Sequence, residues 1–149
     1  YSAFSDRYWR AMMSSTDATL AAIAAKSEKE SAYHLRHSSE WIIRMGDGTD
    51  ESHQRAQSAL SDLWAFTGEL FQPHPEDEAL FASGIAIDPR ELLSPWTENI
   101  ASVLRSASLA LPQNQWMQRG GRSGQHSEHL GHLLSELQSL QRTYPNATW

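Results

Sequence analysis

Residues 17–45 read DATLAAIAAKSEKESAYHLRHSSEWIIRM, with no proline or glycine along their whole length. The first third is rich in alanine, the residue with the highest helix propensity. Asp17 is suited to cap the first turn, and glycines at positions 46 and 48 follow the last turn. We therefore predict one helix over these residues, about 40 Å long.

The flanking sequence repeats the same helical spacing of apolar residues. No alternating β-branched stretch is bounded by hairpin turn signals. Further helical segments are predicted up to about Met13, from Thr49 to before Pro73, over 77–82, from Asp88 to Pro112 and over 127–143. We predict a single all-α domain over residues 1–149, folded as an antiparallel helical bundle.

Composition excludes several classes of function. Cysteine is absent, so the chain has neither disulfides nor thiolate metal ligands. The net charge is −6 and the 12 Lys and Arg residues are scattered, which argues against a nucleic-acid partner. No apolar run approaches the roughly 20 residues of a membrane span, and no signal peptide is recognisable, so we expect a cytoplasmic protein without membrane contact.

The chain opens at Tyr1 inside a helical pattern, and we expect a truncated or processed N-terminus.

The long helix carries a stripe at three-to-four spacing that is apolar at its ends and polar in its middle. We expect this stripe to face the core. Residues 33–41 mix aromatic, basic and acidic side chains around the whole circumference, which predicts contacts on two sides. The stripe consists of Leu20, Ile23, Ser27, Glu30, His34, Ser38, Trp41 and Met45.

Glu30 and His34 are the candidate site residues of this stripe. Burying an unpaired carboxylate and imidazole costs several kcal/mol, so we interpret them as a hydrogen-bonded polar pair or the remains of a lost metal site. Di-iron bundles use Glu-x-x-His, with the ligands three apart, whereas these two are four apart. Neither Glu98 nor Glu128 has a histidine three residues on. The alternative is a ferritin-like di-iron protein that binds metal itself through Glu30 and His34.

A second polar cluster follows the glycine-rich loop at residues 119–124. Histidines at positions 126, 129 and 132 are three residues apart, and each step falls about 60° short of a full turn, so at most two could bind one metal ion. We expect Ser127 or a neighbour to cap the last helix and Glu128 to favour its N-terminal dipole. Arg122, His126 and Glu128 are the candidate interface residues, and Arg122 could alternatively contact a phosphate.

No Gly-x-Ser-x-Gly element supports a nucleophilic hydrolase, and we predict no catalytic residue in this chain.

Five segments, in order along the chain, resemble the phenylacetate-catabolism A/C subunit family, and its C subunits most closely. They span most of the chain, so the resemblance is specific. They are residues 29–41, 44–49, 63–71, 124–131 and 140–149.

The resemblance implies the C-terminal helices of a ferritin-like bundle whose N-terminal helices are missing here. It implies a multicomponent monooxygenase that epoxidises the ring of phenylacetyl-CoA, with the di-iron centre in the A subunit and NADPH, flavin and iron–sulfur groups in a reductase. The C subunit is structural and non-catalytic in this family, so the resemblance implies no cofactor and no metal in this chain. The implied partners are the catalytic A subunit and the other subunits, with Arg122, His126 and Glu128 at an interface or near the CoA. Exposed bundle faces would also favour a homodimer.

Overall fold

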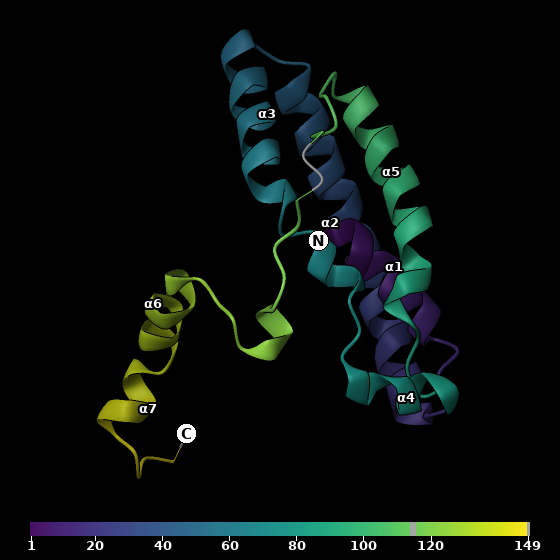
Figure 1. Ribbon diagram of the computed structural model, residues 1–149, viewed down its shortest axis with the longest axis vertical. Helices are drawn as coiled ribbons and strands as arrows, with labels where there is room; N and C mark the ends of the chain where they lie inside the picture. The colour runs from purple at the N-terminus through teal and green to yellow at the C-terminus, as the bar shows by residue number, and fades with distance from the viewer. Residues whose placement is uncertain (114–115, 149) are drawn as a thin grey trace. The chain divides into compact units, whose positions relative to one another are not determined.

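The computed structural model describes residues 1–113 and 116–148, and every regular element in those ranges is a helix (Figure 1). The predicted all-α class is confirmed. The chain divides into two compact units, Tyr1–Gln118 and Arg119–Trp149, and the single-domain assignment stays a prediction. None of the helices in the described ranges has the length and hydropathy needed to cross a bilayer. The first unit contains α1 (Ser2–Met12), α2 (Ala18–Gly46), α3 (Asp50–Trp64), η1 (Gly68–Phe71), η2 (Pro75–Asp77), α4 (Glu78–Ala82), η3 (Pro89–Leu92) and α5 (Leu93–Ser106).

The long helix α2 begins and ends within a residue of its predicted bounds, because side chains satisfy its first free N–H groups. The Asp17 carboxylate accepts hydrogen bonds from the backbone N–H groups of Thr19, at 2.8 Å, and Leu20, at 2.9 Å. At the start of α3, the Thr49 hydroxyl accepts from the N–H of Ser52 at 3.2 Å. The Ser52 hydroxyl in turn accepts from the Thr49 N–H at 3.0 Å, which completes a capping box.

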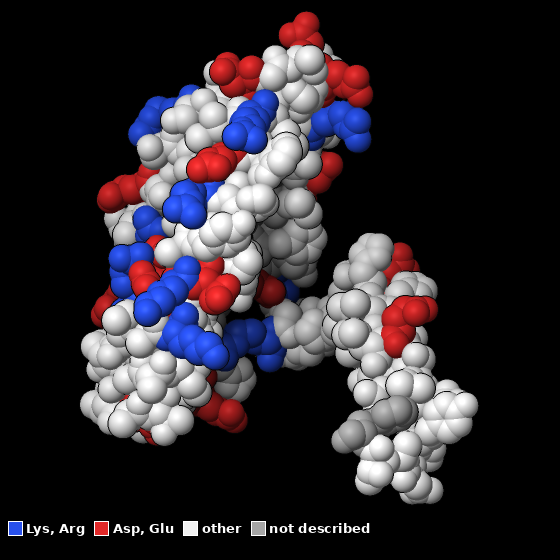
Figure 2. All heavy atoms as spheres, turned by 180° about the vertical axis from the view of Figure 1, so that it is seen from behind, with Lys and Arg blue, Asp and Glu red and all other residues white. Residues whose placement is uncertain are grey.

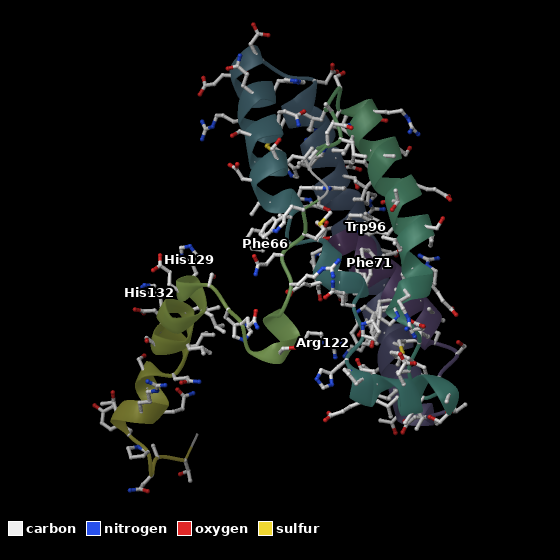
Figure 3. The ribbon with its side chains drawn as sticks, in the orientation of Figure 1. Phe66, Phe71, Trp96, Arg122, His129 and His132 are labelled. Atoms are coloured by element: carbon white, nitrogen blue, oxygen red, sulfur yellow. The ribbon has the colours of Figure 1, made fainter. Side chains whose placement is uncertain are left out.

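The larger core cluster joins α1, η1, η3 and α5. Phe71 and Trp96, both labelled in Figure 3, meet edge to face with ring centroids 5.2 Å apart. Trp64 of α3 lies 5.7 Å from the Trp96 ring, so one indole links three elements. The buried members of this cluster are Ala3, Phe71, Leu92 and Trp96.

A second core cluster holds the ends of α2 and α5 together. Leu104, Ala107 and Leu109 are buried, and Ala107 has no exposed surface. Gly46, the last residue of α2, is also buried, and a Cβ atom built on it would lie 2.1 Å from the Ala107 carbonyl oxygen. Only a glycine permits this close approach of the two backbones.

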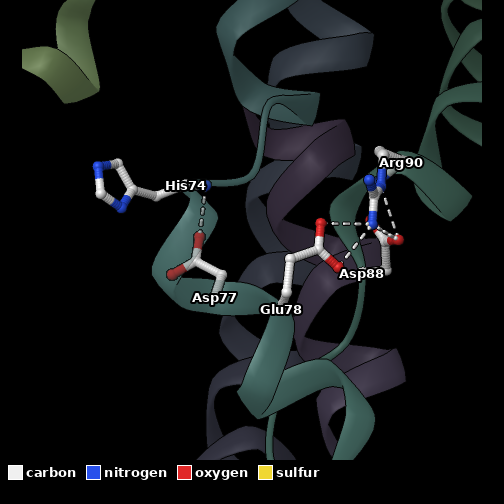
Figure 4. A network of polar contacts seen from close by, with 5 residues as sticks. All are labelled: His74, Asp77, Glu78, Asp88 and Arg90. Atoms are coloured by element: carbon white, nitrogen blue, oxygen red, sulfur yellow. Dashed lines mark hydrogen bonds and ion pairs between the residues drawn. The ribbon is translucent and has the colours of Figure 1, made fainter.

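The connector before α5 is fixed by charged side chains (Figure 4). The Arg90 guanidinium donates to Asp88 at 2.8 and 2.7 Å and pairs with Glu78 at 3.1 Å. The hydrogen bond from Arg90 holds the pKa of the Asp88 carboxyl below its usual value. On the opposite side of the turn, the Asp77 carboxylate accepts from the His74 N–H at 2.8 Å. These contacts hold together a connector that contains Pro73, Pro75 and Pro89.

Helix α3 ends earlier than predicted, at Trp64 instead of just before Pro73. The chain turns at residues 65–67 and forms η1, which carries Phe71 into the core. The sequence has no proline at this turn, and apolar residues continue at helical spacing over residues 56–71. The turn was therefore not predicted. Tertiary packing of Phe71 overrides the local helical preference here.

Helix α5 also ends earlier than predicted, at Ser106 instead of near Pro112. Ser108 adopts a left-handed conformation with φ of 56°. The Leu109 N–H then donates to the Leu104 carbonyl at 2.9 Å, the backbone bond that closes a Schellman motif. Glycine usually occupies such a position, so the serine found here does not indicate a helix end in the sequence.

The second unit contains η4 (Gly121–Ser123), α6 (Glu128–Leu137) and α7 (Ser139–Thr143). The prediction of one continuous helix over 127–143 is wrong, because the chain breaks at Gln138, where φ is −101° and ψ is 0°. The prediction of a buried face on this helix is also wrong, because α6 and α7 contain no buried residue. Residues 119–148 include no third α-helix that could cover that face.

Candidate interaction surfaces

Glu30 and His34 lie on an exposed face of α2, so the predicted buried polar pair is wrong. Helix α1 packs against a different face of α2, on which Ala24 has no exposed surface and Ser31 is buried. The Ser31 hydroxyl lies 3.1 Å from the hydroxyl of Ser5 on α1. Consecutive helical residues point about 100° apart, so burying Ser31 leaves its neighbour Glu30 at the surface.

The described residues do not fit a di-iron centre. Such a centre needs glutamates and histidines that converge from several helices into the interior of a bundle. Glu30 and His34 supply at most two ligands on an open face. Within residues 1–113 and 116–148, no group of three or more His, Asp or Glu side chains could hold a metal ion.

An aromatic ladder runs along the exposed side of α2. The rings of Tyr33 and His37 stack with centroids 5.9 Å apart, and His37 meets Trp41 edge to face at 6.4 Å. Arg36 lies over the Tyr33 ring at 5.7 Å and Arg44 over the Trp41 ring at 5.6 Å. Tyr33 is 53% exposed and Trp41 is 49% exposed. Large aromatic side chains and arginines presented in this way are typical of protein interfaces.

An apolar groove of about 290 Å³ lies between the first residues of the chain, α2, α3 and α5. Leu35, Ile42 and Leu60 are among its lining residues, together with Trp96 and Asn99. The Trp96 indole N–H and the Asn99 side-chain oxygen have no hydrogen-bond partner among the described residues. Both atoms are closed off from solvent, so neither is presented to a molecule in the groove.

The predicted interface residues of the second unit are all at the surface. Arg122 lies in η4 (Figure 3). His126 and Glu128 flank Ser127 at the start of α6, and all three side chains are exposed. Glu128 occupies the first turn of α6, as predicted from the helix dipole. Ser127 holds the N-cap position, but its side chain makes no capping hydrogen bond, so that part of the prediction is wrong. A role for these residues at an interface or near CoA stays a prediction.

Helices α6 and α7 also present a leucine face, which we define as Leu133, Leu137, Leu140 and Tyr144. These side chains are 54%, 64%, 48% and 58% exposed, in that order. Figure 2 shows few charged side chains on the visible side of this unit. Large apolar side chains exposed at helical spacing in this way suggest an interaction site.

A protein-family model described as "Phenylacetic acid catabolic protein" matches residues 1–149, which is the whole chain. The chain belongs to this family. The resemblance seen in the sequence is therefore confirmed, and the observed helical bundle fits the ferritin-like fold that it implied.

This member of the phenylacetic acid catabolic family is also similar to a curated protein. It is 47% identical over 138 residues to the C subunit of 1,2-phenylacetyl-CoA epoxidase from Escherichia coli (strain K12). The match covers 93% of this chain and 56% of that protein. The chain thus spans a little over half the length of the relative.

Sequence reasoning predicted contacts for residues 33–41 of this family member but missed the stacking of their rings, and it missed the apolar groove. The ladder of Tyr33, His37 and Trp41 had a readable signal, since its rings are spaced four residues apart on one helix. The apolar groove had none, because its walls come from helices far apart in the sequence.

Proposed function

We propose that this chain forms part of the C subunit of a multicomponent 1,2-phenylacetyl-CoA epoxidase and serves there as a non-catalytic helical scaffold. The observation that carries the proposal is the 47% identity over 138 residues to the C subunit of such an enzyme. In this proposal the catalytic A subunit holds the di-iron centre, and a reductase delivers electrons from NADPH through flavin and iron–sulfur groups. The complex works in the cytoplasm.

The leucine face supports a scaffold role because it is a ready contact for another subunit. Burying one exposed leucine side chain contributes about 1.5–3 kcal/mol to association. Leu137 is the most exposed leucine of this face. We propose that the catalytic subunit packs over it and that Arg122, His126 and Glu128 lie at or beside the same interface.

The alternative in which this chain itself binds iron receives no support from its side chains. Glu30 and His34 are exposed and, among the described residues, lack the further ligands that a di-iron site requires. A scaffold needs neither residue as a metal ligand.

Co-purification of the catalytic A subunit with tagged variants of this chain tests the proposal. Leu137→Glu places a charge in the leucine face and should weaken binding of the catalytic subunit at least ~10-fold, equivalent to about 1.4 kcal/mol. Ser135→Glu is the matched control, since Ser135 is also exposed but lies on the opposite side of α6, and it should leave binding unchanged. Equal binding by wild type and Leu137→Glu would show that the leucine face is not the contact. Absence of binding by the wild-type chain would count against the scaffold role itself.

A further inference from the structure

Helices α6 and α7 lack the packing that normally keeps a helix folded. Of residues 122–148, all but Leu130 and Gln138 are exposed, and neither helix contains a buried residue. By contrast α3, which also has no buried residue, packs the half-buried Leu60 and Trp64 against the core clusters. Isolated helices shorter than about 12–15 residues are marginal in water. Helix α6 has 10 residues and α7 has 5, so neither is long enough to be stable without a covered face.

Local interactions do not make up for the missing packing. Neither Ser127 nor Gln138, the residues before α6 and α7, makes a side-chain capping hydrogen bond. Gly131 lies inside α6, where glycine is a poor helix former, and the Ser135 hydroxyl donates to its carbonyl at 2.8 Å. Glu128 in the first turn favours the helix dipole, but an exposed charge at a helix end adds only weak stabilisation. The helical state of this segment therefore depends on a partner for its leucine face.

The leucine face forms only when the segment is helical. Its residues are separated by four, three and four positions, which places them on one side of a helix. The spacing carries across the break, because the Gln138 N–H donates to the Leu134 carbonyl and the Gln138 carbonyl accepts from the Arg142 N–H, both at 2.9 Å. In an extended chain, residues 133 and 137 would point away from residues 140 and 144. A partner that covers the whole face therefore binds the helical form in preference to the unfolded one.

We propose that α6 and α7 fold when the leucine face binds its partner, and that this segment is largely unfolded in the free subunit. The inference rests on the proposed function, in which the partner is the catalytic subunit. The helices of the structure are then the bound conformation, and burial of the leucine face supplies the packing that they lack. Binding has to offset the conformational entropy that the segment loses on folding. The affinity for the catalytic subunit is therefore set in part by residues that do not touch it.

Amide hydrogen exchange of the subunit that contains this chain, measured alone and bound to the catalytic subunit, tests the proposal. In the free subunit, the amides of residues 130–143 should exchange within ~10-fold of the unfolded rate, whereas those of α2 should be protected at least ~1,000-fold. Binding should slow the exchange of residues 130–143 at least ~100-fold. Protection of this segment beyond ~10-fold in the free subunit, or no added protection on binding, would overturn the proposal alone. Absence of binding by the wild-type subunit would instead refute the proposed function, and this inference with it.

Helix propensity on the far side of α6 supplies an independent readout. Gly131 and Ser135 lie away from the leucine face, and a Cβ at Gly131 has no neighbouring heavy atom within 4 Å. The double variant Gly131→Ala/Ser135→Ala should therefore make no new contact but should favour the helical state before binding. We expect it to lower the dissociation constant for the catalytic subunit about 5-fold to 10-fold in isothermal titration calorimetry.

Ser61→Ala in α3 is the matched control for this substitution. Ser61 is also exposed and its hydroxyl donates to the carbonyl four residues earlier, at 3.0 Å, as that of Ser135 does. Because α3 packs against the core in the free subunit, Ser61→Ala should leave the dissociation constant unchanged. A double variant of α6 that binds within ~2-fold of the wild type would show that α6 is already formed, which would overturn the proposal.

Discussion

Replacing Gly46 with alanine should destabilise residues 1–118 by about 2 kcal/mol. The added Cβ would lie 2.1 Å from the Ala107 carbonyl oxygen and 2.9 Å from the Ala107 Cβ, and the nearest atom is backbone, which a side-chain rotation cannot relieve. Ala107 would have to retreat by more than about 1 Å, together with the buried Leu104 and Leu109 beside it. Overpacking of this kind lowers the free energy of unfolding by about 3 kcal/mol, and the better helix propensity of alanine raises it by about 1 kcal/mol, which gives the net loss of about 2 kcal/mol.

Urea unfolding followed by far-ultraviolet circular dichroism measures this loss. Gly131→Ala in α6 is the control, because a Cβ at Gly131 has no neighbouring heavy atom within 4 Å. That substitution should be neutral or add up to about 1 kcal/mol of helix stability. The reasoning is refuted if Gly46→Ala unfolds within about 0.5 kcal/mol of the wild type, because α2 and α5 would then not meet as described.

The fold makes three further predictions. Trp96→Ala should lower the free energy of unfolding by about 3–5 kcal/mol in the same urea assay, since it empties the centre of the larger core; a loss under about 1 kcal/mol would contradict that packing. Asp17→Ala should cost about 1 kcal/mol of stability by removing the cap of α2, whereas Ser127→Ala, which removes no capping bond, should be neutral; equal effects would refute the assignment. Because Arg90 lowers the folded-state pKa of Asp88, the stabilisation from their contact is present above the ordinary carboxyl pKa of ~4 and is lost as pH falls through the lowered value. Asp88→Asn should remove this contribution to the acid dependence of stability. A nuclear magnetic resonance titration of the wild-type chain that places the Asp88 pKa at or above ~4 would contradict the prediction.

Local signals in the sequence were sufficient to place the starts of helices that begin at recognisable N-cap residues. Asp17 and Thr49 are N-cap residues of common type, and both start helices where predicted. The ends of α3 and α5 were misplaced because tertiary contacts determine them. Phe71 reaches the core only if α3 stops early, and Ser108 takes a conformation that its residue type does not indicate.

The site prediction failed at a different step. The stripe containing Glu30 and His34 is present on α2 at the predicted spacing, but the face bearing Ala24 and Ser31 is the one that α1 covers. Helical periodicity shows which residues share a face, whereas the choice of the covered face depends on the neighbouring helices. The spacing of residues on α2 therefore does not determine which of its faces is buried.

The central claim is that this chain acts as a scaffold for a separate catalytic subunit. The most direct measurement is the rate of phenylacetyl-CoA epoxidation by the catalytic subunit, its remaining partners and the reductase with NADPH, with and without the subunit that contains this chain. We expect the rate to collapse when that subunit is omitted and to return when it is added back. An undiminished rate in its absence would contradict the account.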